Sequence, residues 1–137
     1  MARLNSKQTN ELAKIFLAYA QVIGDYRYKN FSSLTRAQNK RLREYHKRTL
    51  DYSDDLFTMS AKLVMNDAEQ ALSKLTAITE QMEKSYVSLI NVQKAIGIAT
   101  AIVTLGASVF SLNPQAISEA IGSLSDIFET DSEDESA

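Results

Sequence analysis

The sequence predicts an all-α fold, an elongated antiparallel bundle of four helices, or five if the long third helix breaks. One proline and four glycines in 137 residues are too few for a turn-rich β architecture. Apolar residues recur at steps of three and four along most of the chain, as in amphipathic helices. We expect one domain over residues 1–128. The acidic segment 129–137 has nothing to bury and is expected to be disordered.

The first helix is predicted over residues 6–29, with Ser6 as its N-cap. A break near residues 30–33 follows, and Ser32, Ser33 or Thr35 is expected to cap the second helix. The apolar positions that define the first helix are Leu12, Ile15, Phe16, Tyr19, Val22, Ile23 and Tyr26.

Two later runs alternate steps of three and four, the pattern of left-handed helix packing. They are out of phase across residues 64–71, where Asn66 and Glu69 have capping-box spacing. We expect a turn or kink with Asn66 as the cap; a continuous helix with a phase shift is the alternative. The first run comprises Leu42, Tyr45, Thr49, Tyr52, Leu56, Met59 and Leu63, and the second Leu72, Leu75, Thr79, Met82, Tyr86 and Leu89.

The third helix is predicted from about residue 67 to residue 112, either continuous or broken near Gly97. At ~1.5 Å per residue, a continuous helix would be roughly 65 Å long. It must stop at Asn113, because a residue before proline avoids the helical region. Pro114 then suits the first turn of a last helix, which completes a hydrophobic C-terminal hairpin.

The segment 95–112 is the main functional clue, because no charged residue occurs between Lys94 and Glu119. Apolar positions lie all round this helix, which predicts that it lacks a solvent face. It is either a central helix wrapped by the amphipathic ones, a membrane-inserting element, or an exposed patch that binds a protein. The residues expected to contact a membrane or a partner are Ile98, Ile102, Leu105, Val109, Phe110, Ile117, Ile121, Leu124 and Phe128.

Charge is divided unevenly along the chain. Residues 1–50 carry eleven Lys and Arg against three acids, and residues 51–137 carry four against fourteen. Arg36, Lys40, Arg43 and Lys47 are spaced to line one helix face, where they could contact anionic headgroups. The alternatives are phosphates of nucleic acid, or a solvated face screened by the acidic tail. Nucleic acid is not expected, because the second half is acidic and no stacking platform is evident.

Catalysis is not expected. His46 is the single histidine and there is no cysteine, so the usual nucleophile–base pairs cannot be built. There is no Glu-x-x-His pair and no glycine-rich phosphate loop. We therefore predict no catalytic residues, no metal, no cofactor and no small-molecule substrate.

The sequence thus predicts a non-enzymatic helical protein that associates with or inserts into membranes. The contact elements would be segment 95–112 and an amphipathic helix over residues 115–128, after attraction to an anionic surface. The alternative is a soluble adaptor, inhibitor or assembly subunit that buries the segment against a partner or in a homo-oligomer. The N-terminal region lacks the apolar stretch of a cleavable signal, so a cytoplasmic or membrane-associated protein is expected.

Overall fold

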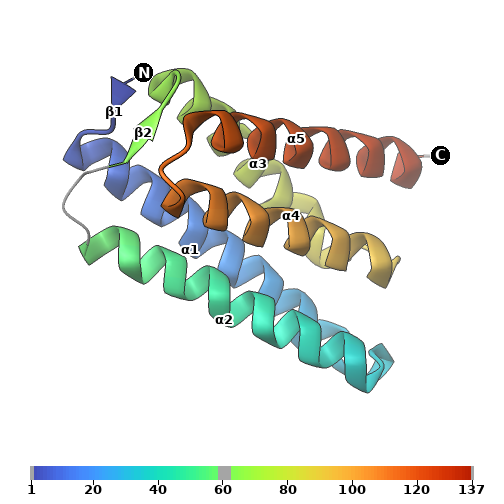
Figure 1. The fold of residues 1–137 in the computed structure, drawn as a ribbon. Coiled ribbons are helices and arrows are strands. Elements are labelled where there is room, and N and C mark those ends of the chain that lie inside the picture. Colours follow the sequence, from blue (N-terminus) through green and yellow to red (C-terminus); the bar gives the residue numbers. More distant parts are fainter. Residues whose placement is uncertain (1, 59–62, 137) are drawn as a thin grey trace.

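The computed structural model of the protein describes residues 2–58 and 63–136. Within these ranges five α-helices pack against one another, which confirms the all-α prediction (Figure 1). Two short 3₁₀ helices lie between helices, η1 (Phe31–Ser33) and η2 (Tyr86–Ser88). The five helices are α1 (Ser6–Lys29), α2 (Arg36–Thr58), α3 (Ala68–Ser85), α4 (Val92–Phe110) and α5 (Pro114–Ser136).

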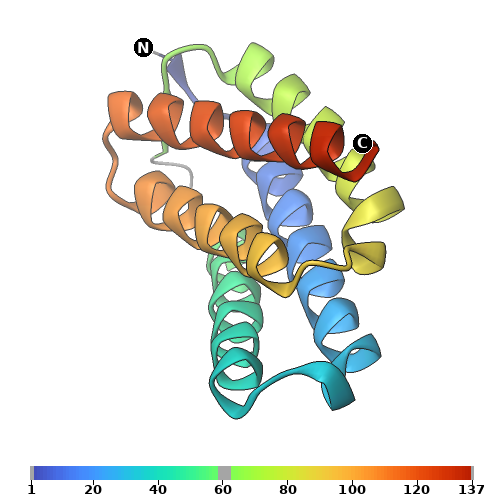
Figure 2. The same ribbon diagram turned by 90° about the vertical axis from the view of Figure 1, so that its right-hand side faces the viewer.

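Helices α1 and α2 form a long antiparallel hairpin (Figures 1 and 2). Their contact includes polar bonds between the helices. The Ser53 hydroxyl donates to the Ala13 carbonyl at 2.9 Å, and His46 Nδ1 lies 2.7 Å from the Ala20 carbonyl oxygen. Of the predicted run, Leu42, Thr49 and Leu56 are buried on α2. Leu63 is buried after the end of α2, and Met59 lies outside the described residues.

A short antiparallel pairing closes one end of the bundle. Strand β1 (Ala2–Arg3) pairs with β2 (Val64–Met65), and the Leu4 amide donates to the Leu63 carbonyl at 2.9 Å. Leu4, Leu63 and Met65 are almost completely buried beside it. The chain before α1 is thereby tied to the connection before α3.

The helix caps differ in part from the prediction. Asn5, rather than Ser6, caps α1 in a reciprocal capping box with Gln8. Thr35 caps α2, as one of the three predicted alternatives, through reciprocal bonds with Gln38. Asp67, rather than Asn66, caps α3 by accepting from the Gln70 amide at 3.0 Å. Asp and Asn cap about equally well, so composition did not choose between these neighbours.

The predicted long third helix is two helices, and the break is not at Gly97. Helix α3 ends at Ser85, and α4 begins after Asn91, whose side chain accepts from the Gln93 and Lys94 amides. Tyr86 fixes the connection, because its hydroxyl donates to the Ala95 carbonyl at 2.7 Å. This break lets α4 turn back across the bundle (Figure 1).

Helices α4 and α5 form the predicted C-terminal hairpin. Pro114 occupies the first turn of α5, as expected, and the Asn113 side chain accepts from the Gln115 amide at 3.0 Å. Leu112 in the connection has a left-handed backbone, with φ of 61°. The backbone of α5 continues to Ser136 through the acidic segment, where the sequence predicted disorder. Extending an existing helix adds one hydrogen bond per residue fixed and avoids a new nucleus, which favours this continuation.

Candidate functional site

Helix α4 packs into the bundle rather than standing apart from it. It lies between α2 and α5, and α5 also contacts α3. Eight of the nine residues predicted to contact a membrane or partner are buried: Ile98, Ile102, Leu105, Val109, Ile117, Ile121, Leu124 and Phe128. The ninth, Phe110, is half-buried and stacks on Tyr52 with ring centroids 5.6 Å apart. In this conformation the predicted contact residues form part of the core.

Helix α4 nevertheless has a solvent face, contrary to the prediction. The face is a narrow stripe of hydroxyl and small residues, and each hydroxyl bonds to a carbonyl of its own helix. Thr100 donates to Ile96 at 2.8 Å, Thr104 to Thr100 at 2.9 Å and Ser108 to Thr104 at 2.9 Å. The solvent face was not predicted because it consists of short hydroxyl residues and carries no charged side chain.

The close approach of α2 and α4 depends on Gly106. A Cβ built on Gly106 would lie 3.0 Å from Cγ of Tyr52 and overlap two further ring atoms. Gly97 has a different role, because a Cβ there would meet nothing within 4 Å. Gly97 instead lines a groove of about 400 Å³ between α4 and α5. The other lining residues are Ala101, Thr104, Ser108, Ala116, Glu119, Ala120, Ser123 and Ile127.

The four cations predicted to contact an anionic surface are all exposed on α2. Arg36, Lys40, Arg43 and Lys47 lie on the side of α2 opposite the buried Leu42 and its neighbours at the α1 contact. No side chain of residues 27–41, at the end of the α1–α2 hairpin, is buried. The face that carries these cations begins at this end of the hairpin, which extends beyond the other helices (Figure 2).

Two aromatic residues at this end were not among the predicted contact residues. Tyr28 is 87% exposed and Phe31 is 57% exposed, at the turn from α1 to α2. The Arg27 guanidinium lies over the Phe31 ring, 5.7 Å from its centroid, and Arg27 Nε donates to Asn39 Oδ1 at 2.7 Å. Neither aromatic fits the spacing of the apolar residues that form a buried helical face. That departure from the spacing was the signal in the sequence that could have identified them as exposed.

The acidic end of α5 does not cover these cations. Helix α5 and helix α2 lie on opposite sides of the bundle in both views (Figures 1 and 2). Screening of the basic face by the acidic segment, one of the alternatives left open by the sequence, would therefore require the backbone of this segment to leave the position it has in α5.

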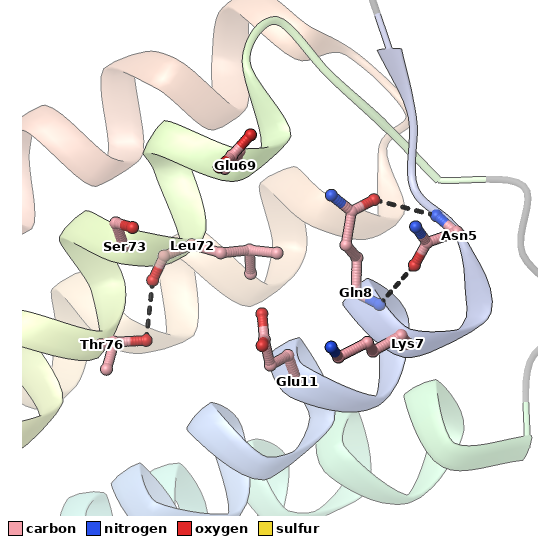
Figure 3. A pocket seen from close by; sticks show the side chains of 8 residues that line it. All are labelled: Asn5, Lys7, Gln8, Glu11, Glu69, Leu72, Ser73 and Thr76. Atoms are coloured by element: carbon pink, nitrogen blue, oxygen red, sulfur yellow. Dashed lines mark hydrogen bonds between the residues drawn. The ribbon is translucent and has the colours of Figure 1, made fainter.

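A polar cleft of about 480 Å³ lies between the starts of α1 and α3 (Figure 3). Asn5 and Gln8 in its wall are joined by the capping box, and the Thr76 hydroxyl donates to the Leu72 carbonyl at 2.8 Å. Lys7, Glu11, Glu69 and Ser73 complete the lining. The side chains of Asn5, Gln8 and Thr76 thus serve the helices themselves.

Within residues 2–58 and 63–136, no group of three or more His, Cys, Asp or Glu side chains is placed to hold a metal ion. Helix α4 is, among the described helices, the one long and apolar enough to cross a membrane. Just over half of it (56% of its most apolar window) is buried in the bundle, and core helices of soluble proteins meet the same criterion. Comparison of the chain with protein-family models, curated proteins and solved structures finds no match.

Proposed function

We propose that this protein is a non-enzymatic helical protein that associates with membranes by releasing the α4–α5 hairpin from its core. The bundle is the storage form, in which α2 and α3 cover the apolar faces of the hairpin. In the membrane form, α4 enters the bilayer and α5 lies at the interface. The cations of α2 supply the first attraction to an anionic surface.

The observation that carries this proposal is the way in which α4 satisfies its own polar groups. The hydroxyls of Thr100, Thr104 and Ser108 each bond to a carbonyl four residues earlier, within the same helix. A helix in a bilayer must satisfy all its polar groups internally. The three hydroxyls of α4 meet that condition already, and the helix carries no charge between Lys94 and its end.

Acidic substitutions on α4 cannot test the proposal. Ile102, Leu105 and Val109 are fully buried, so an aspartate there would place a carboxylate in the core and unfold the bundle. A test must instead hold the hairpin closed without disturbing the fold.

The contact between Tyr52 and Gly106 offers such a lock. In a disulfide, each sulfur lies about 3.0 Å from the Cβ of its partner. A Cβ at residue 106 lies 3.0 Å from the γ position of residue 52, where a cysteine would carry its sulfur. Tyr52→Cys with Gly106→Cys should therefore staple α2 to α4, and the protein has no other cysteine to interfere.

The stapled protein is its own control, because reduction restores the free hairpin in the same polypeptide. We expect the reduced form to float with anionic vesicles after a high-salt wash and to release an entrapped dye. The oxidised form should do neither, while both forms give the same circular dichroism spectrum. Salt-resistant flotation that is equal in the two forms would refute hairpin insertion.

A second function is favoured by the groove between α4 and α5. Its walls are mostly small residues, and Ile127 at its edge is 36% exposed, which suits the ridge of another helix. In this alternative the protein is a soluble adaptor, inhibitor or assembly subunit, and the groove receives a helix of a partner or of a second copy. Light scattering should then give a lipid-free dimer or hetero-complex, and Gly97→Leu, which fills the groove, should dissociate it. A monomer without lipid that does not change with Gly97→Leu would exclude self-assembly through this groove.

A further inference from the structure

The end of the α1–α2 hairpin is a distinct surface, which we call the basic tip and define as residues 27–43. It contains the end of α1, η1 and the first turns of α2. No acidic residue occurs in it, and its cations are Arg27, Lys29, Arg36, Lys40, Arg41 and Arg43. We propose that the basic tip docks the protein on an anionic lipid bilayer, with Tyr28 and Phe31 entering the headgroup region. This inference rests on the proposed function for its membrane partner and names the docking element and the lipid class.

The cations of α2 all lie between Arg36 and Arg48, in the part of the helix that begins at the tip. Beyond Arg48, the outer side of α2 becomes acidic, with Asp51, Asp54 and Asp55 all exposed. A cation near an anionic membrane surface strengthens binding about fivefold. The attraction is therefore directed: it draws the end of the hairpin, rather than the whole length of α2, toward the surface.

The aromatic residues of the tip are held outward. Arg27 both covers the Phe31 ring and bonds to Asn39 on α2, which fixes the turn from both helices. Tyr28 is the residue next to Arg27 and is among the most exposed large hydrophobic side chains of the described chain. Aromatic rings flanked by Lys and Arg are typical of groups that lie at the boundary between water and lipid.

An aliphatic residue favours lipid over nucleic acid as the partner. Ile90 is 87% exposed in the connection before α4. That connection meets the same end of α1, because the rings of Tyr86 and Tyr26 lie 5.3 Å apart. Isoleucine has no ring on which a base could stack. The turn between α1 and α2 stands at the extremity of the bundle (Figure 2).

Docking by the tip does not require the hairpin to open. The turn between α4 and α5 lies at the other end of the bundle from the turn between α1 and α2 (Figure 1). Docking and insertion are therefore separate steps, and the staple between residues 52 and 106 blocks only the second. This separation allows the inference and the proposed function to fail independently.

The protein contains no tryptophan, so a single introduced one reports on its own surroundings. We would compare Phe31→Trp with Phe57→Trp, an exposed site at the far end of α2, both in the oxidised stapled background. With vesicles of phosphatidylcholine and phosphatidylserine at low salt, the emission of the Phe31→Trp variant should shift to the blue. The emission of the Phe57→Trp variant should stay unchanged, and neither variant should respond to phosphatidylcholine alone.

Charge and aromatic variants then test the chemistry of the tip. Lys40→Gln with Arg43→Gln should weaken binding to the phosphatidylserine vesicles about 30-fold. The control, Lys7→Gln with Lys14→Gln, removes two exposed cations of α1 nearer its other end and should change binding little. Tyr28→Ser with Phe31→Ser should weaken binding at least about tenfold, and Phe57→Ser should not.

Each outcome decides a different claim. Docking of the oxidised protein that depends on the tip variants supports the inference, whether or not the reduced protein inserts. Docking without insertion in the reduced protein refutes the proposed function and leaves the inference standing. Loss of docking on oxidation, equal effects of the control variants, or tip-dependent binding to duplex DNA in place of vesicles would overturn the inference.

Discussion

Replacing Gly106 or Gly97 by alanine separates helix packing from helix propensity, because both residues lie on α4. At Gly106 the new methyl group would overlap the Tyr52 ring, and at Gly97 it would enter open space. Alanine is favoured over glycine in a helix interior by about 1 kcal/mol at either position. Forcing one extra carbon into a packed core costs about 1 to 3 kcal/mol.

We therefore expect Gly97→Ala to raise the free energy of unfolding by about 1 kcal/mol. Gly106→Ala should leave it unchanged or lower it by up to about 2 kcal/mol. The difference between the two variants, about 1 to 3 kcal/mol, measures the overlap alone, because the propensity gain cancels. Urea unfolding followed by far-UV circular dichroism gives both values, provided that the slope with urea is unchanged.

A background without the ring completes the experiment. In Tyr52→Ala the obstacle is absent, so Gly106→Ala should stabilise as Gly97→Ala does. Equal stabilisation by the two alanines in the natural background would show that Tyr52 does not lie on Gly106. The packing of α2 on α4 described above would then be wrong.

Three further predictions concern the connections between helices. Leu112→Asn should raise the free energy of unfolding by about 0.5 to 1 kcal/mol, because asparagine tolerates the left-handed backbone; a loss of stability in thermal melts would contradict this. Asp67→Ala should cost about 1 kcal/mol in urea unfolding and Asn66→Ala less, and the reverse order would make Asn66 the cap. Burial, and then Tyr26, raise the pKa of the Tyr86 phenol, so its contribution is complete below the unfolded-state pKa of about 10 and falls by about 1.4 kcal/mol per pH unit above it. Tyr86→Phe should remove that part of the alkaline loss, and an unchanged pH profile would contradict the burial of the phenol.

Apolar periodicity and the position of the proline correctly predicted the first helix and the start of the last one. The first helix runs over the residues that periodicity indicated, and Pro114 begins the last one. The break between α3 and α4 was missed because Tyr86 and Leu89 continue the buried rhythm although they lie outside regular helix. Asn91 was the available sign, since asparagine favours N-caps. A single possible N-cap was weaker evidence for a break than the unbroken spacing of apolar residues was for one continuous helix.

The candidate site was harder to predict, because exposure is a property of the assembled bundle. The sequence left open whether segment 95–112 is buried, and the contacts with α2 and α5 are what cover it. The cations were predicted as a face from spacing alone, and Arg36, Lys40, Arg43 and Lys47 are exposed as expected. Tyr28 and Phe31 gave no periodic pattern, so their position at the end of the hairpin became visible only with the fold.

The contact of Tyr52 with Gly106 and Phe110 also bears on the order of folding. Helices α1 and α2 are joined by a short turn and can pair as soon as both have left the ribosome. The face of α2 that carries Tyr52 stays uncovered until α4, the most apolar helix, has been synthesised. The growing chain therefore passes through a stage in which the α1–α2 hairpin exposes the face of α2 that α4 later covers. Before it docks, α4 also exposes its own apolar surface, and such surfaces promote aggregation. Mutations that slow the docking of α4 should lower the yield of soluble protein more than its final stability.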